Sequence, residues 1–269
     1  MMSRTRLHGL PPNASLLPHF TAYGSGGSGT EETEDETEFS YVNHPETGPE
    51  KWGSIRPEWK LCANGKMQSP IDLHNTRVVV IPNLGKLKRN YKPTNAAVKN
   101  RGHDIMIKWN GDAGSINLNG TAYYLKQCHW HSPSEHTFNG TRHQLELHMV
   151  HETSDGKIAV IGITYKYGPP NPFLQQIIPH ITEVGAEEKD IGIQNPMWIR
   201  AGSRKYYRYM GSLTVPPCTE GVIWTIVTKV RTASKEQVMA LRAAVHDDSE
   251  TNARPIQKRK GRDVGLAKN

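Results

Sequence analysis

Short runs in which apolar and polar residues alternate fill the middle of the chain. This alternation has the two-residue period of a strand with one buried face, and short apolar runs are typical of strands buried on both faces. Asn-Gly or Asp-Gly pairs separate several runs, which is a strong signal for a tight hairpin turn. The pattern predicts strands over residues 77–81, 97–100, 104–109, 115–118, 121–127, 128–131, 144–151, 158–167 and 222–230, with turns at Asn110-Gly111, Asn119-Gly120, Asn139-Gly140 and Asp155-Gly156.

Helical patterns are few. The best lie over residues 172–178 and 234–245, where Ser234 is a candidate N-cap with Gln237 three residues later. We therefore expect one mainly β (α+β) domain over residues 39–258. Residues 1–38 combine a Gly/Ser stretch with an acidic block, and residues 259–269 are basic, so we expect both ends to be disordered.

Charge alone suggests an anionic partner, since the 269 residues carry a formal net charge of +7. Residues 1–38 hold two Arg against six acids, a net charge of −4, so the remainder carries +11. The basic segment KRKGR at 258–262 is the only candidate for nucleic-acid contact, and no nucleic-acid-binding motif accompanies it. We expect no nucleic-acid partner.

Targeting signals are weak in this sequence. No window approaches the ~18 consecutive apolar residues of a membrane-spanning helix, so we expect no membrane span. The apolar stretch within residues 1–23 is interrupted by three prolines and does not form the unbroken core of a secretory signal. No clear signal peptide is therefore expected.

Histidines cluster in the segment QCHWHSPSEHTFNGTRHQLELHMVH, residues 127–151. Strand parity points His129 and His131 to one face, and in the run 144–151 it points His148 to the same side as Glu146. If the two segments pair as a hairpin, three imidazoles converge, which is a ligand set for a catalytic zinc with one open position. Cu or Ni would also accept imidazole, and an isolated His-x-His pair is usually an ordinary surface or core feature.

Carboxylates and amides near such a cluster strengthen the metal interpretation, because ligating imidazoles usually donate their second N–H to an acceptor. Glu146 has the parity of His148, and Gln127 has the parity of His129. From the residues alone, a three-histidine metal site is a reasonable hypothesis.

Five motifs in order resemble the α-class carbonic anhydrases over about 210 residues: GPEKWG at 48–53, QSPIDL at 68–73, the histidine segment, GSLTVPPCTEGVIW at 211–224 and NARPIQ at 252–257. The variants HSPSEH and PPCTEG look most like plant members, which include yam tuber storage proteins. The resemblance implies a large, twisted, mostly antiparallel central sheet of about ten strands with a few short peripheral helices.

The resemblance also implies a site. It would place Zn²⁺ on His129, His131 and His148, with Gln127 and Glu146 as hydrogen-bond partners of these ligands. Thr214 would donate its proton to Glu135, Tyr209 would join the hydrogen-bond network near Thr214, and His103 would act as a proton shuttle. An apolar CO₂ pocket would be lined by Val150, Val160, Leu213, Val215, Val222 and Trp224, with Val215 in a position that is often Thr.

The function implied is reversible hydration of carbon dioxide to bicarbonate and a proton, with sulfonamide-type molecules as inhibitors. The alternative is a storage or binding protein on the same fold with little activity. Degenerate relatives commonly lose a ligand histidine, whereas all three are present here.

Three cysteines allow three single pairings. The disulfide-bearing branch of the family implies that Cys62 pairs with Cys218 and that Cys128 stays free. A disulfide implies an oxidising compartment, either extracellular or like a plastid lumen. Sequons at predicted turns, Asn119 and Asn139, are candidate N-glycosylation sites in such a compartment.

Overall fold

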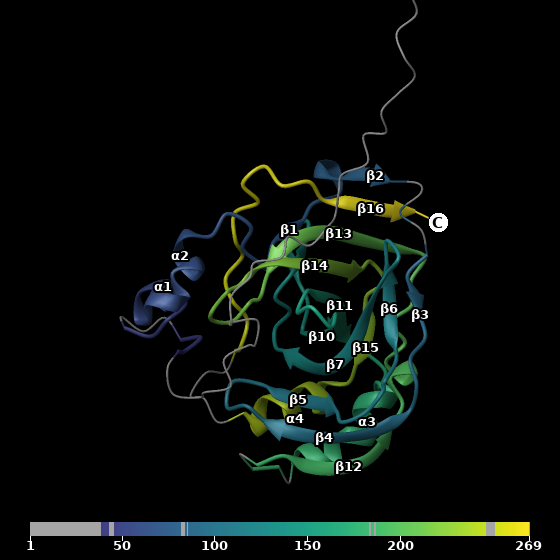
Figure 1. Ribbon diagram of the computed structural model, residues 1–269. Coiled ribbons are helices and arrows are strands. Elements are labelled where there is room, and N and C mark those ends of the chain that lie inside the picture. The colour runs from purple at the N-terminus through teal and green to yellow at the C-terminus, as the bar shows by residue number, and fades with distance from the viewer. Residues whose placement is uncertain are drawn as a thin grey trace, which may run out of the picture.

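A large mixed sheet organises the computed structural model of the chain (Figure 1). The structure describes residues 39–42, 46–81, 84, 86–182, 184–185, 187–245 and 251–268. Residues 1–38, expected to be a disordered arm, lie outside these residues. Within them, the main sheet consists of β2 (Val79–Ile81), β3 (Lys88–Arg89), β4 (Thr94–Asn100), β5 (Ile105–Trp109), β6 (Ser115–Leu118), β7 (Thr121–His131), β10 (Leu145–Glu152), β11 (Ile158–Tyr167), β12 (Lys189–Gln194), β13 (Lys205–Ser212), β14 (Glu220–Val227), β15 (Arg231–Ala233) and β16 (Gly265–Lys268).

Ten of these strands follow one path across the sheet, in the order β12-β4-β5-β7-β10-β11-β14-β13-β16-β2. Most neighbours are antiparallel, while β11 pairs in parallel with β14 and with β15, and β16 with β2. A small second sheet contains β1 (Asp72–Leu73), β8 (Thr137–Phe138) and β9 (Thr141–Arg142). The predicted fold class is confirmed.

Helices are short and peripheral in the described residues: α1 (Trp52–Ile55), α2 (Leu61–Asn64), α3 (Pro172–Ile181), α4 (Lys235–Ala244) and the 3₁₀ turns η1 (Pro57–Trp59), η2 (Asn75–Arg77) and η3 (Pro196–Ile199). Ser234 caps α4 as expected and forms a reciprocal capping box with Gln237. Figure 1 shows α3 and α4 together near β4 and β5, while α1 and α2 lie at another end of the sheet.

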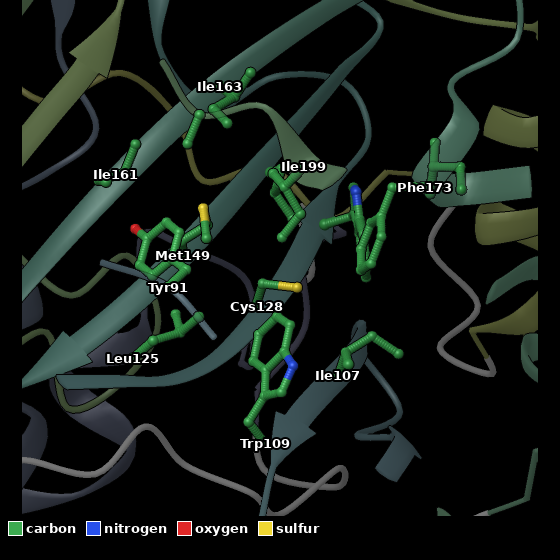
Figure 2. Packing of buried hydrophobic residues seen from close by; sticks show 14 of the residues in the cluster. Tyr91, Ile107, Trp109, Leu125, Cys128, Met149, Ile161, Ile163, Phe173 and Ile199 are labelled. Carbon is green, nitrogen blue, oxygen red and sulfur yellow. The ribbon is translucent and has the colours of Figure 1, made fainter. Parts of the chain in front are cut away.

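The two faces of β7 have different surroundings. Cys128 and Trp130 point into the main apolar core, where Cys128 lies among residues such as Ile107 and Met149 (Figure 2). Trp130 stacks on Phe173 of α3 with ring centroids 6.3 Å apart. The free thiol of Cys128 is fully buried there, and this burial raises its pKa. The alternate residues of β7, His129 and His131, point to the opposite face, as strand parity predicted.

Tight turns formed at two of the Asn-Gly pairs. Asn119 and Gly120 between β6 and β7 both have positive φ, and so do Asn139 and Gly140 between β8 and β9. Positive φ at both central residues is the requirement of a type I′ hairpin turn, which Asn-Gly meets with little strain.

Part of the basic tail, residues 259–269, forms a strand, whereas the composition had suggested that it is disordered. Within the span 259–269, β16 pairs with β13 on one side and β2 on the other. Val264 and Ala267 are buried, so apolar contacts and strand pairing order this segment despite the positive charge before it. The sheet therefore extends beyond the boundary at residue 258 that composition suggested.

The strand β13 was missed in the sequence. Tyr206, Tyr207 and Tyr209 are all buried, because β13 lies between two neighbours and is covered on both faces. Such a strand has no alternation of apolar and polar residues to reveal it.

Candidate metal centre

Three imidazoles converge on the face of β7 and β10 opposite the main core. His129 and His148 are direct partners in the antiparallel pairing of β7 with β10, and His131 is opposite Glu146. One ring nitrogen from each of His129, His131 and His148 lies within 4.8 Å of the others, and all three side chains are buried. The hairpin expected from the sequence therefore brings the three histidines together.

Each of these imidazoles has one ring nitrogen paired with an acceptor. His129 Nδ1 lies 2.9 Å from Gln127 Oε1, and His148 Nε2 lies 3.0 Å from Glu146 Oε1. His131 Nδ1 lies 2.7 Å from the carbonyl oxygen of Asn252. The other ring nitrogens, Nε2 of His129, Nε2 of His131 and Nδ1 of His148, are the ones that a metal would use.

The Asn252 acceptor was missed in the sequence. A backbone carbonyl carries no side-chain signal, and this one lies 121 residues from His131. The side chain of Asn252 also fixes the loop after β7: its Oδ1 accepts from Ser132 N, and its Nδ2 donates to the carbonyls of His103 and Trp130.

Glu146 joins the ligand cluster to a buried network. Its Oε1 lies 2.7 Å from His136 Nδ1, and its Oε2 accepts from the backbone N–H of His136. His136 Nε2 is 2.7 Å from Tyr209 Oη, which lies 2.9 Å from Ser69 Oγ. Tyr209 is thus connected to the ligand cluster through His136, and sequence reasoning had assigned no role to His136 or Ser69.

Burial and charge in this network favour an ionised Glu146 and a neutral His148, whereas they act the other way on His131. Burial raises the pKa of Glu146, but His136 and the hydrogen bonds from His136 and His148 outweigh it and hold this pKa well below its usual value. Burial lowers the pKa of His148. Burial also tends to lower the pKa of His131, but the nearby Glu135 carboxylate outweighs burial and raises this pKa.

Glu146 also needs space, which Gly162 provides. Gly162 is opposite His148 in β11, and a Cβ atom there would lie 3.0 Å from Glu146 Oε1 and 2.6 Å from Ile226 Cδ1. The absence of a side chain at this position lets the carboxylate lie between the two strands.

A metal ion fits the donors present. His131 Nε2 is buried and has no hydrogen-bond partner among the described residues, which is costly unless another group occupies it. Three buried imidazoles with their second nitrogens already paired are the donor set of a metal site with an open position. A second grouping, His136, Glu146 and His148, has its facing atoms joined by hydrogen bonds and suits a metal less well.

Glu135 and Thr214 lie buried, but the hydrogen bond expected between them is not formed. Glu135 Oε1 accepts from Arg254 N at 2.8 Å, while Oε2 has no hydrogen-bond partner in the described residues and lies 3.7 Å from His131 Nε2. The carboxylate therefore faces the ligand cluster with one acceptor oxygen open.

His103 is enclosed, although a proton shuttle has to exchange its proton with solvent. Its side chain is buried, and its ring centroid lies 5.1 Å from that of Phe39. Phe39 belongs to an aromatic cluster with Tyr41, Trp52 and Trp59 that packs over this region. The start of the described chain thus covers His103.

Five of the six expected pocket residues share one apolar cluster. Val150 pairs with Val160, and Val160 with Trp224, so these side chains form a row across β10, β11 and β14. Trp224 lies 4.8 Å from the ring of His148, and Leu213 and Val222 complete the cluster. Val215 is the exception, since it packs with the aromatic residues and the disulfide cysteines instead.

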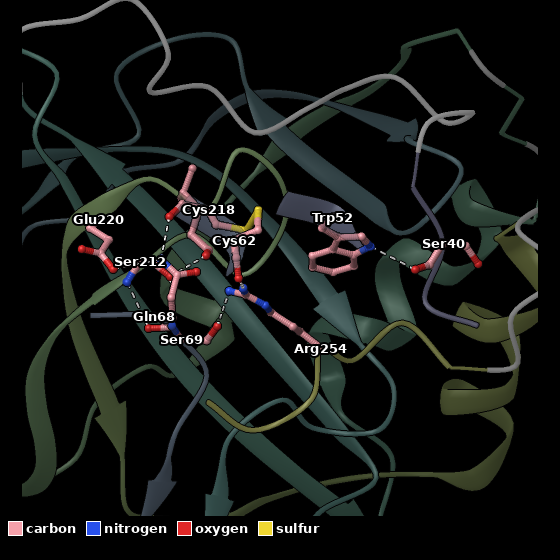
Figure 3. The surroundings of a disulfide bond; sticks show 10 residues. Ser40, Trp52, Cys62, Gln68, Ser69, Ser212, Cys218, Glu220 and Arg254 are labelled. Atoms are coloured by element: carbon pink, nitrogen blue, oxygen red, sulfur yellow. Dashed lines mark hydrogen bonds between the residues drawn. A yellow bond between two sulfur atoms is a disulfide. The ribbon is translucent and has the colours of Figure 1, made fainter. Parts of the chain in front are cut away.

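The Cys62–Cys218 disulfide is formed and joins α2 to the segment that carries Thr214 (Figure 3). Arg254 adds to this connection, because its guanidinium donates hydrogen bonds to the carbonyls of Ser69 and Cys62. Gln68 Nε2 donates to the Cys218 carbonyl. These contacts hold the Leu213–Thr214 segment next to the sheet.

The described residues contain no helix long and apolar enough to cross a membrane.

The sequon residues Asn119 and Asn139 lie at surface turns, and Asn139 Oδ1 accepts a hydrogen bond from Asn75 N.

Comparisons with known proteins agree with this geometry. The family model for eukaryotic-type carbonic anhydrase matches residues 47–268. Alpha carbonic anhydrase 4 of Arabidopsis thaliana is 56% identical over 233 residues, which cover 87% of each chain. A crystal structure of dioscorin complexed with ascorbate has a TM-score of 0.84 at 43% identity and covers 86% of this chain and 98% of that chain.

A complex of the alpha carbonic anhydrase from Thermovibrio ammonificans with the inhibitor sulfanilamide has a TM-score of 0.77 at 36% identity, covering 84% of this chain and 98% of that one. Family, relatives and fold agree over almost all of the described residues. The chain belongs to the carbonic anhydrase family and has plant alpha carbonic anhydrases and a dioscorin among its relatives.

Proposed function

We propose that this protein is a zinc enzyme that catalyses the reversible hydration of carbon dioxide to bicarbonate and a proton. The observation that carries the proposal is the convergence of three buried imidazoles, each with one ring nitrogen paired to an acceptor and the other directed at its neighbours. When bound, zinc supplies a Lewis acid that lowers the pKa of a bound water, an effect for which carbonic anhydrases are the general example.

His129, His131 and His148 hold the metal in this proposal. Gln127, Asn252 and Glu146 fix the orientation of their rings and select the tautomer that leaves the other nitrogen unprotonated: Nε2 for His129 and His131, Nδ1 for His148. The buried, ionised Glu146 also raises the basicity of His148, which strengthens its donation to a cation.

Thr214 and Glu135 orient the reacting oxygen. With its own proton committed to Glu135 Oε2, the Thr214 hydroxyl is left as an acceptor and favours an oxygen that still has a hydrogen to donate. The open Oε2 acceptor of Glu135 supports this role.

Carbon dioxide is apolar and binds weakly, so an apolar wall beside the metal is the fitting surface for it. Val150, Val160, Leu213, Val222 and Trp224 provide that wall, since they share one cluster and Trp224 lies against His148. Val215 faces the disulfide cluster and affects this wall only through the backbone of its segment.

His103 carries the product proton away from the site in this proposal, because imidazole accepts and releases protons near neutral pH. Phe39 covers the ring, so proton release requires the aromatic cluster to open locally or a path past it. The rate of this step is therefore coupled to the packing of Phe39.

Zinc content and stopped-flow CO₂ hydration, measured with and without a sulfonamide, test the proposal. We expect one zinc per chain and hydration that the sulfonamide abolishes. His148→Ala should lose both zinc and activity, whereas His180→Ala, in α3 on the other side of the sheet, should keep both. If the purified protein takes up no zinc, or hydrates CO₂ no faster than buffer does, the proposal that it is an enzyme is refuted.

A storage or binding protein with little activity is the second candidate, because the chain resembles dioscorin. The two candidates differ in one measurement, which is hydration by zinc-loaded protein. Zinc bound at full occupancy without sulfonamide-sensitive hydration would favour the storage protein.

The Cys62–Cys218 bond supports a folding location that is oxidising, either extracellular or like a plastid lumen. In such a compartment Asn119 and Asn139 are accessible acceptors for N-linked sugar. Mass analysis of protein from a plant secretory pathway, before and after enzymatic deglycosylation, tests both assignments.

A further inference from the structure

A second cavity, remote from the three imidazoles, is lined by basic and neutral residues only. It has a volume of about 920 Å³, and six of its ten lining residues are cationic while none is acidic. We name it the basic pocket and define it by Lys86, Arg89, Arg204, Lys205, Lys229 and Arg231.

Three chain segments far apart in the sequence build the basic pocket. One enters β3, one precedes β13, and one connects β14 to β15. Lys205 begins β13, whereas Ser212 ends it near Thr214, so about 23 Å of strand at ~3.3 Å per residue separates the pocket from the segment that carries Thr214. None of the residues that line the pocket belongs to the three-histidine cluster or its hydrogen-bond partners.

Two arginines of the pocket, Arg89 and Arg231, each have a buried Nε donor without an acceptor in the described residues. Arg231 Nη2 donates to the carbonyls of Arg200 and Gly202 at 2.7 and 2.8 Å, which holds its guanidinium in place. Its Nε and the Nε of Arg89 are buried without a hydrogen-bond partner. They are the two guanidinium atoms in this condition among the described residues, and both belong to the same pocket.

Gly202 lets the Arg89 guanidinium lie against the backbone. A Cβ atom at residue 202 would lie 2.7 Å from Arg89 Nη2 and 3.1 Å from Arg89 Nη1. The pocket therefore has a shaped floor, in which Arg89 packs on the loop that Arg231 anchors.

Among the residues that the structure describes, no carboxylate lies close enough to neutralise these charges. Among the described residues, none of the six cations forms an ion pair with an acid within 4.0 Å. Gathering six like charges around one cavity is unfavourable in the absence of a counter-charge. An anion that accepts hydrogen bonds would remove both the repulsion and the deficit of acceptors.

We propose that the basic pocket binds a small molecule with two or more phosphate or sulfate groups. Several oxygens per group match the forked donors of Arg89 and Arg231, and the lysines add point charges around the rim. The volume of about 920 Å³ is large enough for a ligand with several such groups. The site is independent of zinc and of the hydration reaction.

Isothermal titration with inorganic tripolyphosphate, at a fixed ionic strength of about 0.15 M to hold screening constant, tests the proposal. We expect one site per chain. Arg89→Gln should weaken binding at least about tenfold, since hydrogen bonds to charged groups are the strong ones. Gly202→Ala removes no charge but displaces the Arg89 guanidinium, so its loss should approach that of Arg89→Gln.

The matched control is Lys60→Gln with Lys126→Gln, which removes two exposed positive charges outside the pocket. This variant should bind tripolyphosphate as the unaltered protein does, and a thermal melt of each variant checks its folding. An equal loss in the control, or full affinity in Gly202→Ala, would overturn the proposal, because binding would then depend on net charge alone.

A membrane could present the same chemistry through phosphorylated headgroups. Flotation with vesicles that contain a phosphorylated phosphoinositide, run in parallel with the titration, separates the two sources. If the protein binds tripolyphosphate in the titration and does not float with the vesicles, the small-molecule site is supported. If it floats with the vesicles and gives no binding heat with tripolyphosphate, the small-molecule site is refuted and the pocket is assigned to a lipid surface.

Discussion

Replacing Glu146 by Gln is a sharp test of the metal centre, because the two side chains have nearly the same shape. Oε1 of Glu146 accepts from His136 Nδ1 and His148 Nε2, and Oε2 accepts from the backbone N–H of His136. Glutamine has one acceptor oxygen and one donor group. In either orientation its NH₂ group meets a donor that the carboxylate had satisfied.

The size of the effect follows from this geometry. If the amide oxygen replaces Oε1, the backbone N–H of His136 loses its acceptor; if the amide is turned, both imidazoles lose theirs. Leaving a buried donor unpaired costs about 1–3 kcal/mol, so the metal-free protein should unfold at lower urea concentration. Removing an acceptor from a metal ligand typically costs about 10–100-fold in metal affinity, which we expect for zinc here.

Competition with a chromogenic chelator measures the zinc affinity, and urea unfolding of the metal-free protein measures the stability. Glu220→Gln is the matched control, since Glu220 Oε1 also accepts two hydrogen bonds, from Met67 N and Gln68 Nε2, but contacts no ligand imidazole. The control should keep its zinc affinity, since its amide oxygen can still accept both hydrogen bonds and no ligand imidazole is altered. Unaltered zinc affinity in Glu146→Gln, or an equal loss in both variants, would refute the reasoning.

Three further predictions concern proton transfer, the disulfide and acid stability. His103→Ala should lower CO₂ turnover in weak buffer and be rescued by added imidazole, while Phe39→Ala should raise it by uncovering His103; unchanged turnover in both variants would remove the shuttle assignment. Replacing Cys62 and Cys218 by Ala opens a loop of 156 residues and should cost about 5 kcal/mol in urea unfolding on the chain-entropy model, so a loss below about 1 kcal/mol would contradict a stabilising bond. Burial lowers the pKa of His151 to about 4, whereas an exposed imidazole titrates near 6.5, so the unfolded chain binds more protons below pH 6.5. Stability contributed by neutral His151 is therefore present above pH 6.5 and falls by about 3 kcal/mol on reaching pH 4; unfolding curves of His151→Gln should show a correspondingly smaller pH slope, and identical slopes would contradict this account.

Local patterns in the sequence were sufficient for the strands that carry the histidines. The two-residue period placed His129 and His131 on one face of β7 and Cys128 and Trp130 on the other, as the structure has them. The run at 158–167 matches β11, because its apolar residues and flanking turn signals are contiguous. The family resemblance likewise needed only the sequence, since it rests on five motifs that follow one another in the family's order.

Contacts between distant residues were not available from such patterns. The carbonyl of Asn252 reaches His131, and β16 enters the sheet beside β13, through pairings that join segments more than fifty residues apart. The burial of His103 beneath Phe39 likewise depends on where the start of the domain crosses the sheet.

The amino-acid sequence by itself determined which side chains can hold a metal, since periodicity acts between neighbours a few residues apart. The tertiary structure decided which nitrogen of each imidazole is paired with an acceptor, which oxygen of Glu135 has no partner in the described residues, and which cations meet at the basic pocket. These depend on how segments distant in the sequence pack against one another, because a hydrogen bond or an ion pair exists only when packing brings its two groups within about 3–4 Å.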